Sequence, residues 1–140
     1  MAVHVLAVLA YREGDRVTSA YLASSINTNP VIVRRLLLSL QKARLVDTTK
    51  GAGAGSRLSR SPQRINLAEI YRSVEAGESF SPPSRKPSSD CAVGSCIIAA
   101  LAGIFASAQN AMERDLAKTS LADVIHTLKS SDASARKKAG

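Results

Sequence analysis

Tryptophan is absent from this 140-residue sequence, and aromatic residues of all kinds make up only 4% of it. With 45% hydrophobic residues a core is possible, but it must be built from aliphatic side chains. No apolar run approaches the roughly 20 residues that a membrane span needs. The apolar start MAVHVLAVLAYREGD also lacks the basic region and the cleavage site of a signal peptide. We therefore expect a cytoplasmic protein without a membrane partner, whose two cysteines form no permanent disulfide.

Patterns typical of enzymes are missing too. No set of Ser, His and Asp, or of Cys and His, has a recognisable catalytic arrangement, and no metal-ligand spacing occurs. The glycine-rich stretch KGAGAGSRLSR, residues 50–60, shares only its glycines with a nucleotide-binding loop. Such loops open a helix and carry Lys and Ser or Thr after the last glycine, whereas Gly55 here is followed by Ser56 and Arg57. We therefore predict neither an enzyme nor a metal site.

The positive charge is concentrated in the N-terminal half. The net charge is +8 overall, and residues 1–64 carry ten Lys or Arg against three acidic residues. Residues 65–128 carry five basic and seven acidic residues, and residues 129–140 carry four and one. This distribution indicates a surface that binds a polyanion. The alternative, a soluble basic protein with no such partner, has the same composition.

Two helices separated by a short polar turn are predicted in this basic half. After a first helix near the N-terminus, a second begins near Val17 and Thr18. Either Thr18 or Ser19 can cap it, and its apolar stripe includes Tyr21. A third begins at Asn29 and Pro30, because Asn caps helices and Pro is favoured at the first helical position. It runs to about Arg44 and has apolar residues three and four apart. Together these features predict a helix-turn-helix.

A β-hairpin is predicted immediately afterwards. The segments LVDTT and RLSRS are short and β-prone, and KGAGAG lies between them. Glycines adopt positive φ angles without steric cost, so this loop can form a tight, mobile hairpin tip. A basic hairpin after a helix-turn-helix makes a winged helix, whose wing can approach a phosphate backbone closely.

The predicted fold is therefore mainly α: a winged helix-turn-helix with a long C-terminal dimerisation helix. The winged helix takes up residues 1–77 and ends with the helix INLAEIYRSVEAG. Residues 78–92, rich in proline and serine, form a linker or sensor loop. Residues 93–128 form dimerisation helices, with Thr119 capping the last, and residues 129–140 form a disordered basic tail.

The long helix carries a wide apolar stripe with residues every three or four positions. The predicted dimerisation residues are Ile97, Ile98, Leu101, Ile104, Phe105, Ala108 and Met112. Such a stripe can pack on its own domain or on a second copy of the chain. Periodicity does not distinguish these two possibilities.

Five segments resemble the Rrf-two family of bacterial winged-helix transcriptional regulators, which includes the iron–sulfur cluster regulator IscR. These segments are AVHVLAVLAY, residues 18–60 with the wing KGAGAGSRLSR, INLAEIYRSVE, CAVG and LAKTSLADVI. The resemblance covers roughly residues 2–128 and is greatest to the YwnA-like branch. The wing matches a family pattern like R-G-x-G-G-G-x-x-L-A-R, except that Ala54 replaces a glycine.

This resemblance implies a homodimer that binds double-stranded DNA in a sequence-specific manner and usually represses transcription. The N-terminal residues of the second helix of a helix-turn-helix face base edges, while a wing contacts the backbone or the minor groove. The predicted DNA-binding residues are Thr28, Asn29, Val31, Ile32, Arg34, Arg35, Lys42, Lys50, Gly51, Gly53, Gly55, Arg57 and Arg60. The alternative function is a winged helix that binds protein or RNA and has no sensing role.

The cysteines depart from the pattern of cluster-binding relatives, which place three in the loop before the long helix. This chain has only Cys91 and Cys96, whereas a [2Fe–2S] centre normally takes four ligands. His4 and His126 lie in other predicted elements and are expected to be surface or partly buried residues. We therefore predict no cofactor; a bridged cluster with unusual ligands is the alternative. The two thiols are either redox-active, because a helix N-terminus lowers a thiol pKa, or small packing residues.

Overall fold

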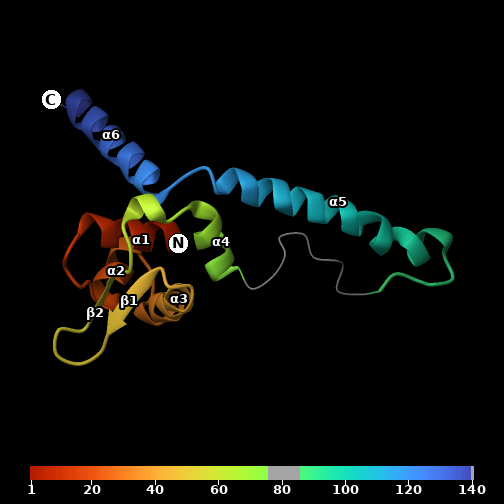
Figure 1. Cartoon of the computed structure of the whole chain (residues 1–140), viewed down its shortest axis with the longest axis horizontal. Coiled ribbons are helices and arrows are strands. Elements are labelled where there is room, and N and C mark those ends of the chain that lie inside the picture. The colour runs from red at the N-terminus through yellow and green to blue at the C-terminus, as the bar shows by residue number, and fades with distance from the viewer. Residues whose placement is uncertain (76–85, 140) are drawn as a thin grey trace.

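A computed structural model describes residues 1–75 and 86–139, with side chains up to Ala133. The elements in chain order are α1 (Ala2–Tyr11), α2 (Ser19–Ile26), α3 (Pro30–Lys42), β1 (Val46–Thr49), β2 (Gly55–Leu58), the short 3-10 helix η1 (Pro62–Arg64), α4 (Leu67–Val74), α5 (Ala92–Leu116) and α6 (Leu121–Ala139). In Figure 1, α1 to α4 and the hairpin form one lobe, from which α5 and α6 extend as two arms. The mainly helical fold with a two-stranded wing confirms the predicted fold class.

Side-chain caps define where the two helices of the helix-turn-helix begin. The Thr18 hydroxyl accepts a hydrogen bond from the Tyr21 backbone N–H at 3.3 Å. The Asn29 carboxamide oxygen accepts one from Val31 N–H at 2.8 Å, and Pro30 is the first helical residue of α3. Each cap satisfies a donor that the helix itself leaves without a partner. Both predicted helix starts are thus confirmed, but Tyr21 is 46% exposed and does not belong to the buried stripe of α2.

An aliphatic core holds the lobe together, as the shortage of aromatic residues requires. Its fully buried members of largest volume are Leu6, Leu9, Leu22, Leu40, Leu45, Ile65, Ile70, Leu121, Val5, Val33 and Val46. These side chains come from α1 to α4, the first strand, the start of α6 and the connections that contain Leu45 and Ile65, so the core joins distant segments of the chain. Burying each one contributes about 1.5–3 kcal/mol relative to leaving it exposed.

The wing is an antiparallel hairpin that is also hydrogen-bonded to the segment before α2. Within the hairpin, Val46 pairs with Leu58 and Thr49 with Gly55. Val17 and Ser56 exchange two backbone hydrogen bonds of 2.9 and 2.8 Å, so a third segment lies beside β2. At the tip, Gly51 and Gly53 have φ angles of +84° and +74°, which other residues rarely adopt. The predicted hairpin is confirmed, and Gly51 and Gly53 lie in its turn.

The helix α4 begins with a reciprocal pair of hydrogen bonds. Asn66 accepts from the Glu69 backbone N–H at 3.0 Å, and the Glu69 carboxylate accepts from the Asn66 backbone N–H at 3.1 Å. This capping box fixes the first turn. Next to it, Leu67 N–H donates to the Thr119 carbonyl at 3.0 Å, and Leu121 N–H donates to the Ile65 carbonyl at 2.8 Å. The start of α6 is thereby attached to the start of α4.

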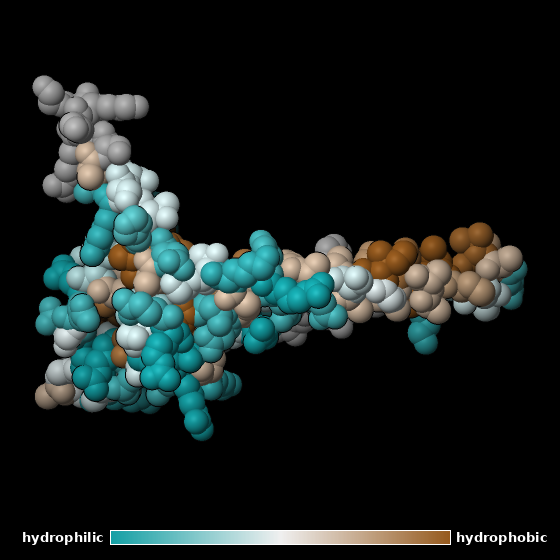
Figure 2. Space-filling model, turned by 45° about the horizontal axis from the view of Figure 1, so that its top comes forward, coloured by the Kyte–Doolittle hydropathy of each residue, from teal (hydrophilic) through white to brown (hydrophobic). Residues whose placement is uncertain are grey.

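The helix α5 has no buried residue, although it is the most apolar long helix that the structure describes. Figure 2 shows hydrophobic residues along the part of this arm that is remote from the lobe. By length and composition α5 is able to cross a membrane, so the expectation that no segment has this length is wrong. Alanines, glycines and serines separate the larger apolar residues, but no charged residue occurs between Asp90 and Glu113.

The C-terminal segment differs from its prediction in two ways. Residues 129–139 continue α6 as a helix, so the expected disorder of residues 129–140 is corrected for all but the last residue, which lies outside the described part. The reason is composition, because no Gly or Pro interrupts the chain from Leu121 to Ala139. The cap of α6 is Ser120, whose hydroxyl accepts from Asp123 N–H at 3.1 Å, and not Thr119.

Candidate nucleic-acid interface

The N-terminal turn of α3 presents apolar and basic side chains to solvent. Val31 and Ile32 are each 47% exposed, which is unusual for large aliphatic residues in a chain with a well-filled core. Arg34 and Arg35 follow in the next turn and are exposed. Predicted contacts Thr28, half-buried, and Asn29, whose side chain caps the helix, come just before them. This set can offer methyl groups and guanidinium donors to base edges in a major groove.

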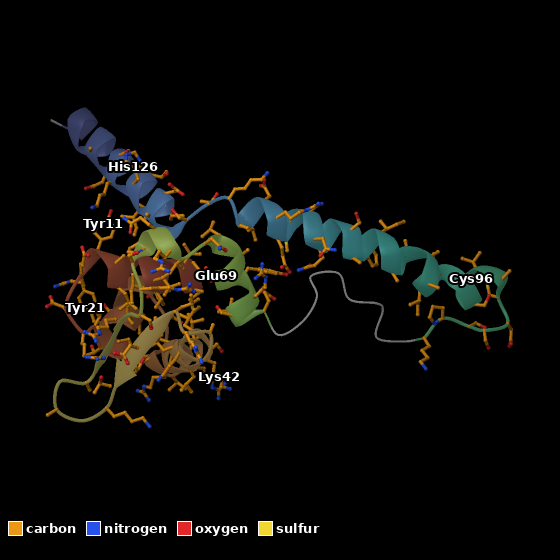
Figure 3. All side chains as sticks on the ribbon, in the orientation of Figure 1. Tyr11, Tyr21, Lys42, Glu69, Cys96 and His126 are labelled. Atoms are coloured by element: carbon orange, nitrogen blue, oxygen red, sulfur yellow. The ribbon has the colours of Figure 1, made fainter. Side chains whose placement is uncertain are left out.

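Four of the predicted DNA-binding cations have no acidic partner in the described part of the chain. They are Arg34, Arg35, Lys42 and Lys50, and all four are exposed. Figure 3 shows Lys42 on α3, where it is the last helical residue. Unpaired cations on one surface attract phosphates, whereas paired ones must first give up their carboxylates.

A groove of about 490 Å³ separates α3 from the wing. Arg34, Leu37, Leu38 and Gln41 line it from the helix, while residues 48–51 and 54–56 line it from the hairpin. Leu38 is 59% exposed there, and the sequence analysis did not assign it to the interface. The groove brings Arg34 and Lys50, which lie 16 positions apart, to one cavity. The predicted reading helix and wing therefore share one surface.

The other two wing cations are paired with carboxylates. Arg57 lies 3.3 Å from the Asp47 carboxylate, which also binds Arg16 at 2.8 Å. Hydrogen bonding from Arg16 is the largest effect that lowers the pKa of Asp47, so this carboxylate is ionised at neutral pH. Arg60 binds Glu69 of α4 at 2.8 Å, which holds the end of the wing to the lobe.

The three glycines of the wing occupy two different environments. Gly51 and Gly53 are exposed at the tip, where the analysis of the sequence expected them. Gly55 is instead buried at the start of β2, and a Cβ atom there would lie 2.9 Å from the Arg16 backbone carbonyl carbon. We therefore reassign Gly55 from contact with DNA to packing inside the protein. No local signal identifies Arg16 as its neighbour, because 39 positions separate the two.

Both cysteines lie at the end of α5 that points away from the lobe, where Figure 3 labels Cys96. Cys91 is the residue before the helix, Cys96 is in its second turn, and both are exposed free thiols. Hydrogen bonds from the backbone N–H groups of Gly94 and Val93 lower the pKa of Cys91 below its usual value. The predicted burial of these thiols as packing residues therefore does not occur within this chain.

Comparison with known proteins agrees with this geometry. A profile of the Rrf2 family, described as an iron-dependent transcriptional regulator, matches residues 1–127. The chain belongs to the Rrf2 family. It is 38% identical over 128 residues to YwnA of Bacillus subtilis (strain 168), a candidate HTH-type transcriptional regulator, which covers 91% of this chain and 94% of YwnA. The resemblance predicted from the wing and helix motifs is confirmed.

Solved structures give the same result for the fold of this Rrf2 protein. A crystal structure of a candidate DNA-binding protein is 38% identical and superposes with a TM-score of 0.69, covering 89% of this chain and 95% of the other. A candidate transcriptional regulator from Lactobacillus plantarum has a TM-score of 0.76 at 23% identity, covering 99% and 95%. This Rrf2 protein is a DNA-binding transcriptional regulator and not an enzyme.

The iron in the description of the Rrf2 family does not match the donor groups of this member. Cys91 and Cys96 are its only cysteines, and a cluster normally needs four ligands. Within residues 1–75 and 86–139, no three His, Cys, Asp or Glu side chains are placed to hold a metal ion. The residues present do not fit a resident iron–sulfur cluster, and its absence stays a prediction.

Proposed function

We propose that this Rrf2-family protein is a cytoplasmic, homodimeric repressor that binds near-palindromic duplex DNA and responds to oxidation of its thiols. The groove between α3 and the wing carries the proposal, because Arg34 and Lys50 both line it. Exposed Val31 and Ile32 lie about one turn before Arg34 on the same helix. Cations bind any phosphate backbone, whereas aliphatic side chains at the start of α3 read thymine methyl groups. The combination suits a specific duplex better than a random polyanion.

The homodimer is supported by the apolar stripe of α5. Ile98 is 39% and Ile104 is 61% exposed in the single chain, and no residue of this helix is buried. A second copy would cover the two stripes at once, in the manner of paired amphipathic helices. We favour this occupant over a membrane because the same helix binds the lobe through Gln109 and Glu113, which meet Tyr71 and Arg72 of α4.

Repression and thiol sensing follow from where these parts lie. A dimer bound to two half-sites blocks other proteins from the same DNA and needs no further surface to do so. The exposed Cys91, with its lowered pKa, carries a larger thiolate fraction at neutral pH than an ordinary thiol. Because Cys91 adjoins the proposed dimer helix, its oxidation would disturb the spacing of the two reading helices.

The test of DNA binding compares two cations in the same groove. Arg34→Ala should relax base preference by about 1–3 kcal/mol at its position, as expected for a base contact. Lys50→Ala should weaken all duplexes alike and flatten the dependence of log K on log salt by about one unit. Duplexes selected by the wild-type protein and random duplexes are compared by fluorescence anisotropy, with Lys118→Ala on the distant α5–α6 connection as the charge-matched control.

Several results of this experiment would contradict the proposal. Equal losses on selected and random duplexes for both variants would remove Arg34 from base reading. Wild-type protein that binds heparin-like polyanions or single-stranded RNA as tightly as any duplex would favour the alternative winged-helix module. Footprinting of an isolated half-site would contradict the dimer.

The thiol test uses one-cysteine variants. Cys96→Ser leaves only Cys91, and Cys91→Ser leaves only Cys96. Iodoacetamide should react faster with Cys91 at neutral pH, because its thiolate fraction is higher. Oxidation of the wild-type protein should then change its affinity for the selected duplex. Two thiols that react no faster than a model thiol would end the sensing proposal and leave DNA binding untouched.

A further inference from the structure

We infer that Arg16 is a positioning residue for the wing: it anchors both strands of the hairpin and neutralises Asp47, so that Arg57 is free to bind a phosphate. The inference rests on the proposed DNA-binding function and deepens it. Arg16 itself needs no contact with DNA, because it acts through Asp47 and the backbone of the wing.

The hydrogen bonds of Arg16 reach both strands. One guanidinium nitrogen donates to the backbone carbonyls of Asp47 and Gly55 at 3.4 and 3.3 Å, and the other donates to the Asp47 carboxylate at 2.8 Å. Asp47 belongs to β1 and Gly55 to β2, so one side chain contacts both strands of the hairpin. The segment that carries Arg16 lies outside the wing, between α1 and α2.

Backbone contacts at the same place fix the angle of the hairpin. Val17, the next residue, exchanges two hydrogen bonds with Ser56, which is 1% exposed and also hydrogen-bonds Thr48 across the hairpin at 2.9 Å. Gly55 packs directly on the Arg16 backbone, where any Cβ atom would collide. The wing is therefore attached to the lobe along one edge, and Arg16 is the charged part of that attachment.

The electrostatic part of the argument concerns Asp47, the only acid on the hairpin. A lone carboxylate there would repel phosphates and hold Arg57 as its counter-ion. The Arg16 contact is the shorter one, and its side chain is 26% exposed, whereas Arg57 is 53% exposed and lies 3.3 Å away. Exposed ion pairs are weak, so Arg57 can exchange Asp47 for a phosphate while Asp47 keeps Arg16.

The experiment is a rescue of Arg16→Met by Asp47→Asn. Methionine keeps the packing of the aliphatic stem but leaves Asp47 with Arg57 as its remaining partner. Affinity for a selected duplex should fall about tenfold near 0.1 M salt, and the salt slope should flatten by about one unit. In the double variant the acid is gone, so Arg57 is released and the slope should return to the wild-type value. Lys118→Gln, with the same loss of charge far from the wing, is the control.

A measurement without DNA tests the anchor itself. Hydrogen exchange of the Val17 and Ser56 amides should speed up in Arg16→Met, while the exchange of core amides in α1 stays unchanged. Thermal unfolding by circular dichroism establishes that each variant folds. A double variant with DNA completes the test. If Arg57→Gln and Arg16→Met together flatten the slope of log K against log salt by no more than either alone, both residues act on one phosphate contact.

Three outcomes would overturn the inference. If Asp47→Asn does not restore the slope, Arg16 itself binds a phosphate and is no positioning residue. If Arg16→Met leaves both affinity and amide exchange unchanged while the wild-type protein binds its duplex, the inference fails and the proposed function stands. If the wild-type protein prefers no duplex, the proposed function fails and the inference fails with it.

Discussion

The lobe and the α5 arm are both rich in aliphatic residues but bury them differently. In the lobe, Leu6, Leu40 and Ile65 are fully buried against one another. In α5 the same residue types leave no side chain buried, and Ile104 is 61% exposed. A folded domain buries its apolar side chains in a core. An exposed apolar stripe, as on α5, is instead typical of a surface that binds a partner. The comparison separates residues that hold the fold from residues assigned to the proposed dimer.

Leu40→Ala should have the largest effect on stability. Leu40 is fully buried where α3 meets the core, so truncation leaves a cavity and should cost about 2–5 kcal/mol of unfolding free energy. Urea denaturation followed by circular dichroism measures this loss. A cost below about 1 kcal/mol would mean that the lobe does not form the closed core described above.

Ile104→Glu tests whether the apolar stripe of α5 forms the proposed dimer interface. In a single chain this residue is mostly exposed, so a charge there should leave the folding of the lobe unchanged. In a dimer it would bury an unpaired carboxylate, and the dimer should dissociate with about a hundredfold loss of operator affinity. Analytical ultracentrifugation and gel shifts measure the two effects. Ala99→Glu, on the opposite face of the same helix, is the control; equal dissociation by both would contradict the assigned stripe.

Arg72→Gln should have the smallest effect, because it touches only the joint between the two regions. Arg72 binds Glu113 of α5 at 2.7 Å, and both Gln109 and Arg72 lower the pKa of Glu113. Since the folded-state pKa is the lower one, this contribution is present at neutral pH and is lost as the pH falls through that value. The pair is exposed, so we expect a change of a few-fold at most in operator affinity. A loss as large as that of Ile104→Glu would show that the arm depends on this joint.

Local signals were enough to predict most of the lobe, including the start of the helix that we propose reads DNA. Thr18, Asn29 and Pro30 define helix starts within one turn of sequence, and glycines define the tip of the wing. What the sequence did not show are contacts between distant positions. The bond from Arg16 to Asp47 spans 31 positions, and nothing in either neighbourhood marks it.

The misjudged elements have their own physical reasons. The end of α6 is polar, a composition also typical of disordered tails, but its alanines, lysines and arginine favour a helix and no glycine or proline interrupts them. Tyr21 has helical spacing but lies exposed, where its hydroxyl accepts a hydrogen bond from Arg12 at 2.8 Å. Composition and periodicity limit the secondary structure and burial that a segment can have. Contacts with other segments of the fold determine which of these occurs.

The backbone hydrogen bonds between residues 65–67 and 119–121 have a consequence for how this chain is built. These bonds join the start of α6 to the start of α4, although more than 50 positions separate the two segments in the sequence. The arm formed by α5 is therefore inserted between two segments that contact each other directly. If α5 were replaced by a short connector, α6 would still pack on α1 and Leu121 would stay in the core. If the proposed function holds, the parts proposed to sense and to pair can change while the DNA-binding lobe keeps its core.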